Sequence, residues 1–266
     1  MASAKAGAST VLCGAVGSDG RLAAELVQTL VEAGVDTNHV LRVEDVPTGT
    51  ALITVDATGQ NSVVVVSGAN GHVGPQMLSG VQMSEDDVLV AQCEIPIRTV
   101  RAFFEVGAGV GATCILNAAP VVDGIGNLLS LCDILVVNES ELVQLSGRGV
   151  DGLRADWSLS DARERLEFRG FSGVLVATLG SAGASAAWRG GTVQVPGHKV
   201  AAVDATGAGD CFVGCMAAAL SRGSSLEAAM RFANAAAALS VQTAGASASM
   251  PRQTEIVEWM ERADGQ

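Results

Sequence analysis

Short apolar segments of strand length alternate with longer segments of helical periodicity along this 266-residue chain, and this alternation constrains its fold most. Strands that alternate with helices form a mostly parallel sheet that helices cover on both faces. The length suits one large α/β domain or two small ones, and no internal repeat or Pro- or Ser-rich linker divides the chain. The pattern predicts buried strands at residues 11–17, 88–91, 113–116, 134–137 and 174–178.

A hairpin interrupts this series. Residues 50–55 and 62–66 alternate around the turn-rich segment 56–61, which predicts two antiparallel strands. A hairpin within a series of parallel strands is not expected to join their sheet. We therefore expect it to protrude over the functional face of the domain.

Periodicity and turn residues predict the other elements. Helices are expected at residues 22–33, 96–106, 159–169, 211–221, 226–242 and 254–262 and from Glu139, and short strands at 184–188, 193–196 and 200–203. Segment 148–158 is polar and Gly-rich and predicts a loop, with Ser160 or Asp161 as the cap of the following helix. Ligands bind beyond the carboxyl ends of such strands. We expect four polar residues at strand ends to converge there: Asn117, Asn138, Thr178 and Asp204.

The charge of the chain excludes several classes of partner. A net charge of −12 argues against nucleic acid or an anionic membrane surface as partner.

The longest apolar run, at 235–241, is far shorter than the ~20 residues of a membrane span. Lys5 and Lys199 are the only lysines, and the chain has no G-x-x-x-x-G-K-[ST] P-loop. An ATP site here would hold the phosphates through backbone amides and a metal.

The six cysteines lie mostly in apolar runs, and none forms a C-x-x-C pair. They are interpreted as buried reduced thiols, which favours a cytoplasmic location. Cys211 and Cys215 share a helix face, but no nearby His or third Cys completes a metal site.

The segment from Val203 to Gly214 carries the clearest chemical pattern. Gly207, Ala208 and Gly209 leave backbone N–H groups bare at a predicted helix N-terminus, where anions bind. Asp210 lies where these groups point. A carboxylate beside an anion hole can accept the proton of a hydroxyl that attacks a phosphoryl group. The alternative is an ordinary N-cap aspartate after a Gly-rich turn.

Residues 204–210 resemble the signature D-T-x-G-A-G-D of the ribokinase-like (phosphofructokinase-B) family of carbohydrate kinases. Ala205 replaces the usual Thr, and Cys215 stands where a small Ala or Gly is usual; neither change affects the acid or the anion hole. The resemblance runs over essentially the whole chain. Four more motifs occur in the family's order: Ser67-Gly68-Ala69-Asn70, Asn117-Ala118-Ala119-Pro120, Asn138-Glu139-Ser140-Glu141 and Thr178-Leu179-Gly180-Ser181-Ala182-Gly183.

The resemblance implies a three-layer α/β sandwich with a small β lid. Residues 1–266 would form a single kinase domain, with the hairpin at 48–67 as the lid. Dimerisation through lids is common in the family, so a homodimer is one expectation, although the sequence leaves the oligomeric state open.

The resemblance also assigns roles within the site. Asp210 would be the catalytic base beside the sugar, with Gly207, Ala208 and Gly209 as the anion hole. Glu94 would hydrogen-bond the sugar, unless it is a solvated glutamate at a helix start. ATP would contact Asn138, Thr178, Gly180, Gly183, Gly209 and Asn234. For the segment 178–183, an ordinary turn between strands is the alternative.

Two kinds of cation are expected. Asn138 and Glu141 lie three residues apart at a helix start and can hold Mg²⁺ through its waters, although the same spacing is typical of a capping box. The resemblance further implies a monovalent cation, K⁺ in this hypothesis, beside the anion hole. Its expected positions are Asp204, Thr206, Ser240, Thr243, Gly245 and Ser249.

The N-terminus departs most from the family pattern. Residues 2–9 resemble the end of the helix that follows the family's G-G-K-G-A-N motif. The resemblance therefore predicts an N-terminally truncated kinase that lacks one strand, half the lid and most sugar contacts. An unpaired sheet edge and weak ribose binding are expected. A truncated form of an active kinase is preferred over a natural short form without sugar binding, because the phosphate machinery is intact.

The expected function is ATP-dependent phosphorylation of a pentose, with D-ribose at its 5-hydroxyl preferred because of residues 67–70, Glu94 and the hairpin. The alternatives are a family kinase that acts on adenosine, fructose, deoxyribose or another nucleoside, and a catalytically silent binding or scaffold protein. An NAD-binding enzyme is disfavoured, because no G-x-G-x-x-G follows an early strand and opens a helix.

Overall fold

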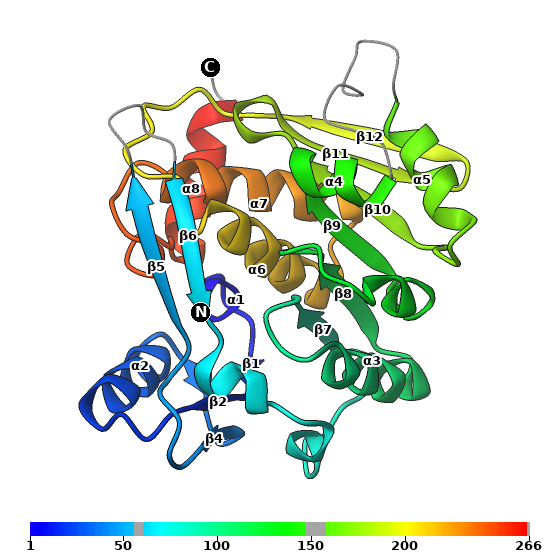
Figure 1. Ribbon diagram of the computed structural model, residues 1–266. Helices are drawn as coiled ribbons and strands as arrows, with labels where there is room; N and C mark the ends of the chain where they lie inside the picture. The colour runs from blue at the N-terminus through cyan, green and yellow to red at the C-terminus, as the bar shows by residue number, and fades with distance from the viewer. Residues whose placement is uncertain (56–60, 147–157, 265–266) are drawn as a thin grey trace.

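A six-stranded sheet runs through the middle of the molecule in the order β12-β11-β10-β9-β8-β7 (Figure 1). The computed structural model describes residues 1–55, 61–146 and 158–264. Strands β7 to β10 are parallel, and β11 runs antiparallel to both of its neighbours. The strands are β7 (Val88–Ala91), β8 (Thr113–Asn117), β9 (Ile134–Asn138), β10 (Val174–Thr178), β11 (Gly183–Trp188) and β12 (Gly191–Pro196).

Helices cover both faces of this sheet, as the alternation in the sequence predicts. Side chains along β9 alternate between the two cores: Ile134 and Val136 pack into one, while Leu135 and Val137 pack into the other. The first core lies under α1 (Ala2–Lys5), α6 (Ala208–Ser221), α7 (Leu226–Ser240) and α8 (Gln253–Asp264). The second lies under α3 (Ile97–Val110), η3 (Ile125–Leu131), α4 (Glu139–Ser146) and α5 (Leu159–Glu167). In the described part of the chain, no helix combines the length and apolarity that crossing a membrane requires.

The N-terminal region forms separate strand pairs. Strand β1 (Thr10–Val11) pairs with β3 (Val35–Asp36), and β2 (Gly14–Val16) pairs with β4 (Val40–Arg42), with α2 (Arg21–Glu32) between them in sequence. The predicted single buried strand at 11–17 is therefore wrong. The chain changes partner at Leu12 and Cys13, and Val11 is 49 % exposed. Among the described strands, β7 ends the main sheet on this side.

The predicted hairpin is present as β5 (Thr50–Val55) paired with β6 (Asn61–Val66), although residues 56–60 of its tip lie outside the described residues. Two short 3₁₀ helices follow, η1 (Gly68–His72) and η2 (Pro75–Leu78). The Ala69 N–H donates to the Pro47 carbonyl at 2.9 Å, so the segment 67–70 lies at the base of the hairpin. In Figure 1 the hairpin stands apart from the main sheet.

Two local predictions are corrected. Residues 200–203 form no strand, because their backbone is tied to the segment after α7 instead: the Val203 N–H donates to Val241 O at 2.7 Å. The cap of α5 is Ser158, whose Oγ accepts from the Asp161 N–H while the Asp161 carboxylate accepts from the Ser158 N–H. Neither Ser160 nor Asp161 is the cap. The predicted loop at 148–158 lies outside the described residues, except for Ser158.

Helix α3 offers a matched test of its packing on the sheet. A Cβ on Gly107 would lie 2.5 Å from Leu89 Cδ2 and 2.9 Å from Cys114 Sγ, whereas a Cβ on Gly109 would meet nothing within 4 Å. We expect Gly107→Ala to lower the free energy of unfolding by roughly 1–3 kcal/mol through overpacking. Gly109→Ala should raise it by about 0.5–1 kcal/mol through helix propensity. Chemical denaturation of both variants measures this, and equal effects of the two substitutions would contradict the packing.

Candidate active site

Polar residues at the ends of three parallel strands meet at one edge of the sheet. Asn117 ends β8, Asn138 ends β9 and Thr178 ends β10, and Thr178 pairs directly with Asn138. This part of the predicted convergence is confirmed, because parallel neighbours place their carboxyl ends together. Asp204 was expected to end a fourth strand, which is wrong because it follows an irregular segment.

Helix α7 leads from this edge to the turn before α6. Asn234, which is buried in α7, donates through Nδ2 to the Pro196 carbonyl at the end of β12, at 2.8 Å. Helix α7 then continues to Ser240, and Val241 O accepts from the Val203 and Asp204 N–H groups at 2.7 and 3.1 Å. The turn before α6 is thus anchored beyond the same strand ends.

The first turn of α6 presents free backbone donors. Gly207 is the N-cap, with φ +78°, and no side chain caps the helix. The Ala208 N–H donates to Ala205 O at 3.2 Å. Within the described residues, the N–H groups of Gly207, Gly209 and Asp210 have no acceptor. Three donors at a helix N-terminus form a site for an anion.

Asp210 is the third residue of α6, so the interpretation of this aspartate as an N-cap is wrong. No hydrogen bond or ion pair engages its carboxylate within the described parts of the chain. The residue as a whole is exposed at the surface. Its carboxyl is nevertheless partly desolvated by the surrounding protein, and this desolvation raises the pKa of Asp210 above its ordinary value. An unpartnered carboxylate with raised proton affinity is suited to act as a general base.

Asp204 fixes this turn from behind. Its Oδ1 accepts from the Thr206 N–H and its Oδ2 from the Gly245 N–H, each at 2.9 Å. Hydrogen bonds from Thr206 and Gly245 lower the pKa of Asp204 to about 2. A Cβ on Gly207 would lie 3.0 Å from the Cβ of Ala246, so the turn and the segment 241–249 are also in close contact. The sequence gives no signal for Ala246, because backbone proximity alone determines its role.

Five of the six residues expected around a monovalent cation fall into these two adjoining segments, and the sixth, Ser240, is the last residue of α7. The Asp204 carboxylate accepts hydrogen bonds from the N–H groups of Thr206 and Gly245. The Thr243 N–H donates to Ser240 O at 3.2 Å, and Ser249 Oγ donates to Ala246 O at 3.1 Å. No cluster of three or more His, Cys, Asp or Glu residues able to hold a metal ion occurs in the described residues, so a cation here would depend on carbonyl and hydroxyl oxygens.

Asn138 and Glu141 form the reciprocal cap of α4. Glu141 Oε2 accepts from the Asn138 N–H at 2.8 Å, and Asn138 Oδ1 accepts from the Glu141 N–H at 2.9 Å and from Ser140 Oγ at 2.7 Å. The capping box is therefore present, and it fixes the orientation of both side chains. Half-burial raises the pKa of Glu141. A nearby cation would stabilise the ionised form of this carboxyl, so capping and metal binding are compatible here.

The segment from Thr178 to Gly183 forms a tight loop above β10. Leu179 N–H donates to Gly183 O at 2.8 Å, and Gly180 and Gly183 have φ values of +54° and +99°. A Cβ on Gly183 would lie 2.2 Å from Val195 O, whereas Gly180 faces open space. Gly183 is thus required by strand packing, and Gly180 leaves room for a ligand beside the backbone.

Glu94 lies on the exposed loop between β7 and α3, and its N–H donates to Gln92 Oε1 at 2.9 Å. Because α3 begins at Ile97, Glu94 is not a first-turn helix residue. Burial, followed by the charge of Glu141, raises the pKa of the neighbouring Cys93 to about 11. The loop that carries Glu94 therefore lies near Glu141, and α6 packs against β7 on the other side.

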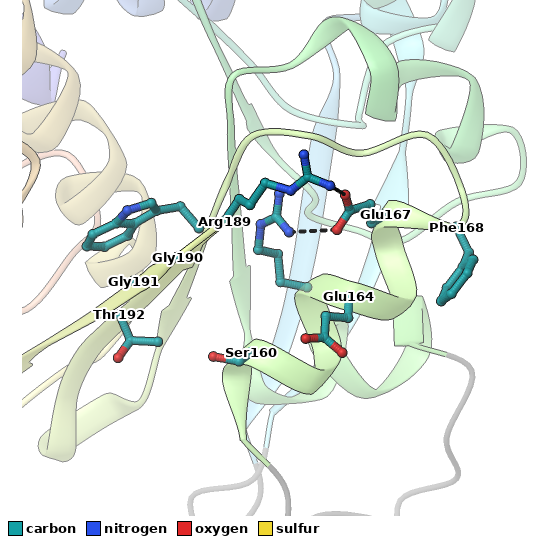
Figure 2. Close-up of a pocket in the computed structure, with 10 residues that line it drawn as sticks. Ser160, Glu164, Glu167, Phe168, Arg189, Gly190, Gly191 and Thr192 are labelled. Carbon is teal, nitrogen blue, oxygen red and sulfur yellow. Dashed lines mark hydrogen bonds and ion pairs between the residues drawn. The ribbon is translucent and has the colours of Figure 1, made fainter.

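A hollow of about 610 Å³ lies elsewhere, between α5 and the β11–β12 hairpin (Figure 2). Glu167 pairs there with Arg163 at 3.0 Å and with Arg189 at 3.2 Å, as the dashed lines in Figure 2 show. Trp188, at its rim, ends β11, whereas Gly183 begins that strand at the candidate site. The hollow is therefore at the opposite end of the sheet, and its charged groups neutralise one another.

The structure is an α/β fold in which free backbone N–H groups lie beside an unpartnered carboxylate at the edge formed by the strand ends. The sequence comparison gives the family: residues 1–253 match pfkB family carbohydrate kinase. The chain belongs to this family and is a carbohydrate kinase.

Known relatives agree with this assignment. The chain is 35 % identical to the ribokinase of Staphylococcus aureus, with 96 % of this chain and 84 % of the relative covered. It is 32 % identical to the deoxyribokinase of Salmonella typhi, with 98 % and 84 % covered. The structure of Arabidopsis thaliana ribokinase complexed with ribose and ATP superimposes with a TM-score of 0.83 at 29 % identity, with 98 % of this chain and 84 % of that chain covered.

The clamp formed by Asp204 predicts a pH dependence of stability. A carboxyl whose pKa is lowered on folding stabilises the fold above its unfolded pKa of about 3.9, and this contribution is lost as the pH falls toward 2. We expect Asp204→Asn to lower the melting temperature at pH 7 and to flatten its fall between about pH 4 and pH 2. Asp36→Asn is the matched control, because Asp36 accepts a single local bond from the Asn38 N–H. Identical pH profiles for both variants would contradict the clamp.

Proposed function

We propose that this carbohydrate kinase transfers the γ-phosphoryl group of ATP to the 5-hydroxyl of D-ribose. One observation carries the proposal: the Asp210 carboxylate is unpartnered and lies in the same helical turn as the free N–H groups of Gly207, Gly209 and Asp210. The similarity to ribokinases supports the choice of sugar.

In this reaction Asp210 accepts the proton of the sugar hydroxyl as its oxygen attacks the γ-phosphorus. The bond between that phosphorus and the bridging oxygen of ATP breaks, and ADP leaves. The three free N–H groups face the phosphoryl oxygens, where they stabilise the charge of the transition state. The raised pKa of Asp210 favours proton acceptance.

The nucleotide would lie along the edge formed by the strand ends. Its expected contacts are the loop at Thr178 and Gly180, together with Asn138 and Asn234. Asn138 and Glu141 offer amide and carboxylate oxygens, the donor types that Mg²⁺ prefers, and their fixed cap geometry fits a hydrated ion. Mg²⁺ would neutralise phosphate charge. Glu94 would bind the sugar from the β7 loop, beneath the β5–β6 hairpin as lid.

Replacement of the base gives the direct test of the role of Asp210. We expect Asp210→Asn to lower kcat by ~10²–10⁴-fold, because the amide cannot accept the proton, while ATP binding persists. Steady-state kinetics and calorimetry with ATP measure the two effects. Asp86→Asn is the control, because Asp86 is exposed just before the amino end of β7. If Asp210→Asn keeps more than about a tenth of the wild-type rate, its assignment as the base is wrong.

A substrate panel tests the sugar. D-ribose should give the highest kcat/KM among ribose, deoxyribose, fructose and adenosine. Deoxyribose is the second candidate, because a deoxyribokinase is among the relatives. If another sugar is preferred, ribose is not the main substrate, although the protein is still a kinase. If the protein binds nucleotide but turns over none of these compounds, a catalytically silent binding protein is favoured.

Monovalent cation activation is a further part of the proposal. K⁺ beside Asp204 and Gly245 would order the segment behind the anion hole, with Thr206, Ser240, Thr243 and Ser249 supplying other oxygens. We expect a higher kcat in K⁺ than in Na⁺ or Tris buffers at equal ionic strength. Equal rates in all three buffers would rule out a K⁺ requirement.

A further inference from the structure

Lys5, one of only two lysines in the chain, binds the segment that follows α7. Its Nζ donates to Ser247 O at 3.1 Å and to Met250 O at 3.0 Å. Both acceptors are backbone carbonyls more than 240 residues away in sequence. An ammonium group that donates to two carbonyls forms charge-assisted bonds, which are stronger than those between neutral groups.

The carbonyls that Lys5 holds lie directly behind the anion hole. Between them, Ser249 Oγ donates to Ala246 O at 3.1 Å, which closes the turn on itself. The other side of this turn carries Ala246, which abuts Gly207, and Gly245, whose N–H donates to Asp204. A displacement of residues 245–250 would therefore move the N-cap of α6.

Lys5 is itself held on a fixed support. Its helix α1 packs against α6, where a Cβ on Gly214 would lie 2.6 Å from the Cβ of Ala2. Arg222, just beyond the end of α6, donates to Ala6 O at 2.9 Å. The body of α6 thus positions α1, Lys5 extends from α1 to the segment 245–250, and that segment contacts the first turn of α6.

We propose that Lys5 is a positioning residue for phosphoryl transfer: its ammonium group holds the segment 245–250 against the first turn of α6 and so keeps the free N–H groups aligned. This inference rests on the proposed kinase function. Lys5 acts through Asp204, Gly245 and Ala246 and need not touch a substrate. Its effect is therefore expected in kcat more than in KM.

The test compares Lys5→Met, Lys5→Arg and Lys199→Met. Methionine keeps the length of the chain without the charge, arginine keeps the charge and the donors, and Lys199 is the exposed second lysine. We expect Lys5→Met to lower kcat about tenfold or more, with the KM values for ATP and ribose changed by less than about threefold. Lys5→Arg should recover most of the rate, and Lys199→Met should match the wild type.

Amide hydrogen exchange gives a readout that does not need turnover. In Lys5→Met, the Gly245 and Cys211 N–H groups should exchange faster, because the first bonds to Asp204 across the affected contact and the second bonds to Gly207 O in the first turn of α6. Exchange in β9 should stay unchanged. Wild-type rates and wild-type exchange in Lys5→Met would overturn the inference, as would a loss shared equally with Lys199→Met. If the wild type itself shows no turnover, the kinase proposal fails, and the exchange result alone decides the role of Lys5.

Discussion

The carboxylate of Asp204 joins two segments on which the candidate site depends. It accepts hydrogen bonds from the N–H groups of Thr206, in the turn before α6, and of Gly245, 41 residues beyond Asp204 in the chain. Both bonds involve a charged acceptor, and the low pKa of Asp204 reflects how strongly the fold favours the ionised form. With the turn held in this way, the N–H groups of Gly207, Gly209 and Asp210 have no acceptor among the described residues.

The sheet supplies the rest of the site through its topology. Strands β8, β9 and β10 are parallel, so the polar residues that follow them gather at one edge although they are far apart in sequence. Asn234 extends this edge by binding the end of β12, and α7 continues from there toward the segment 241–249. The elements proposed to bind the nucleotide and the phosphoryl group are thereby fixed to one scaffold, which transfer between two bound substrates requires.

The sequence predicted the layers of the fold, because these follow from local patterns of apolar residues. The apolar run at 134–137 correctly predicted a strand in a sheet covered on both faces, and the side chains of β9 pack alternately into the two cores. At Asn138 and Glu141 the capping box, given as the alternative to a Mg²⁺ site, is present, and the Mg²⁺ site stays a prediction. The predicted strand at 200–203 was wrong: the Val203 N–H donates to a distant carbonyl, Val241 O, and no local pattern reveals this contact.

The sequence could not predict the contacts that the segment 245–250 makes with Gly207 and Lys5. Ala246 matters through its distance from Gly207, and Lys5 acts on two backbone carbonyls, so neither has a partner side chain that a motif could identify. The Gly-rich run predicted an anion hole made by Gly207, Ala208 and Gly209. In the structure the free N–H groups are those of Gly207, Gly209 and Asp210, because the Ala208 N–H donates to Ala205 O. Such differences arise from tertiary geometry.

Amide NMR tests directly whether the free N–H groups in the first turn of α6 bind the phosphoryl group. ¹⁵N-labelled protein would be titrated with ADP, ribose and aluminium fluoride, which together mimic the phosphoryl group in transfer. The account predicts large shifts for the N–H groups of Gly207, Gly209 and Asp210, and a smaller one for Ala208, whose N–H is already bonded. If the mimic binds while these three resonances stay in place, the phosphoryl group lies elsewhere and the account is contradicted.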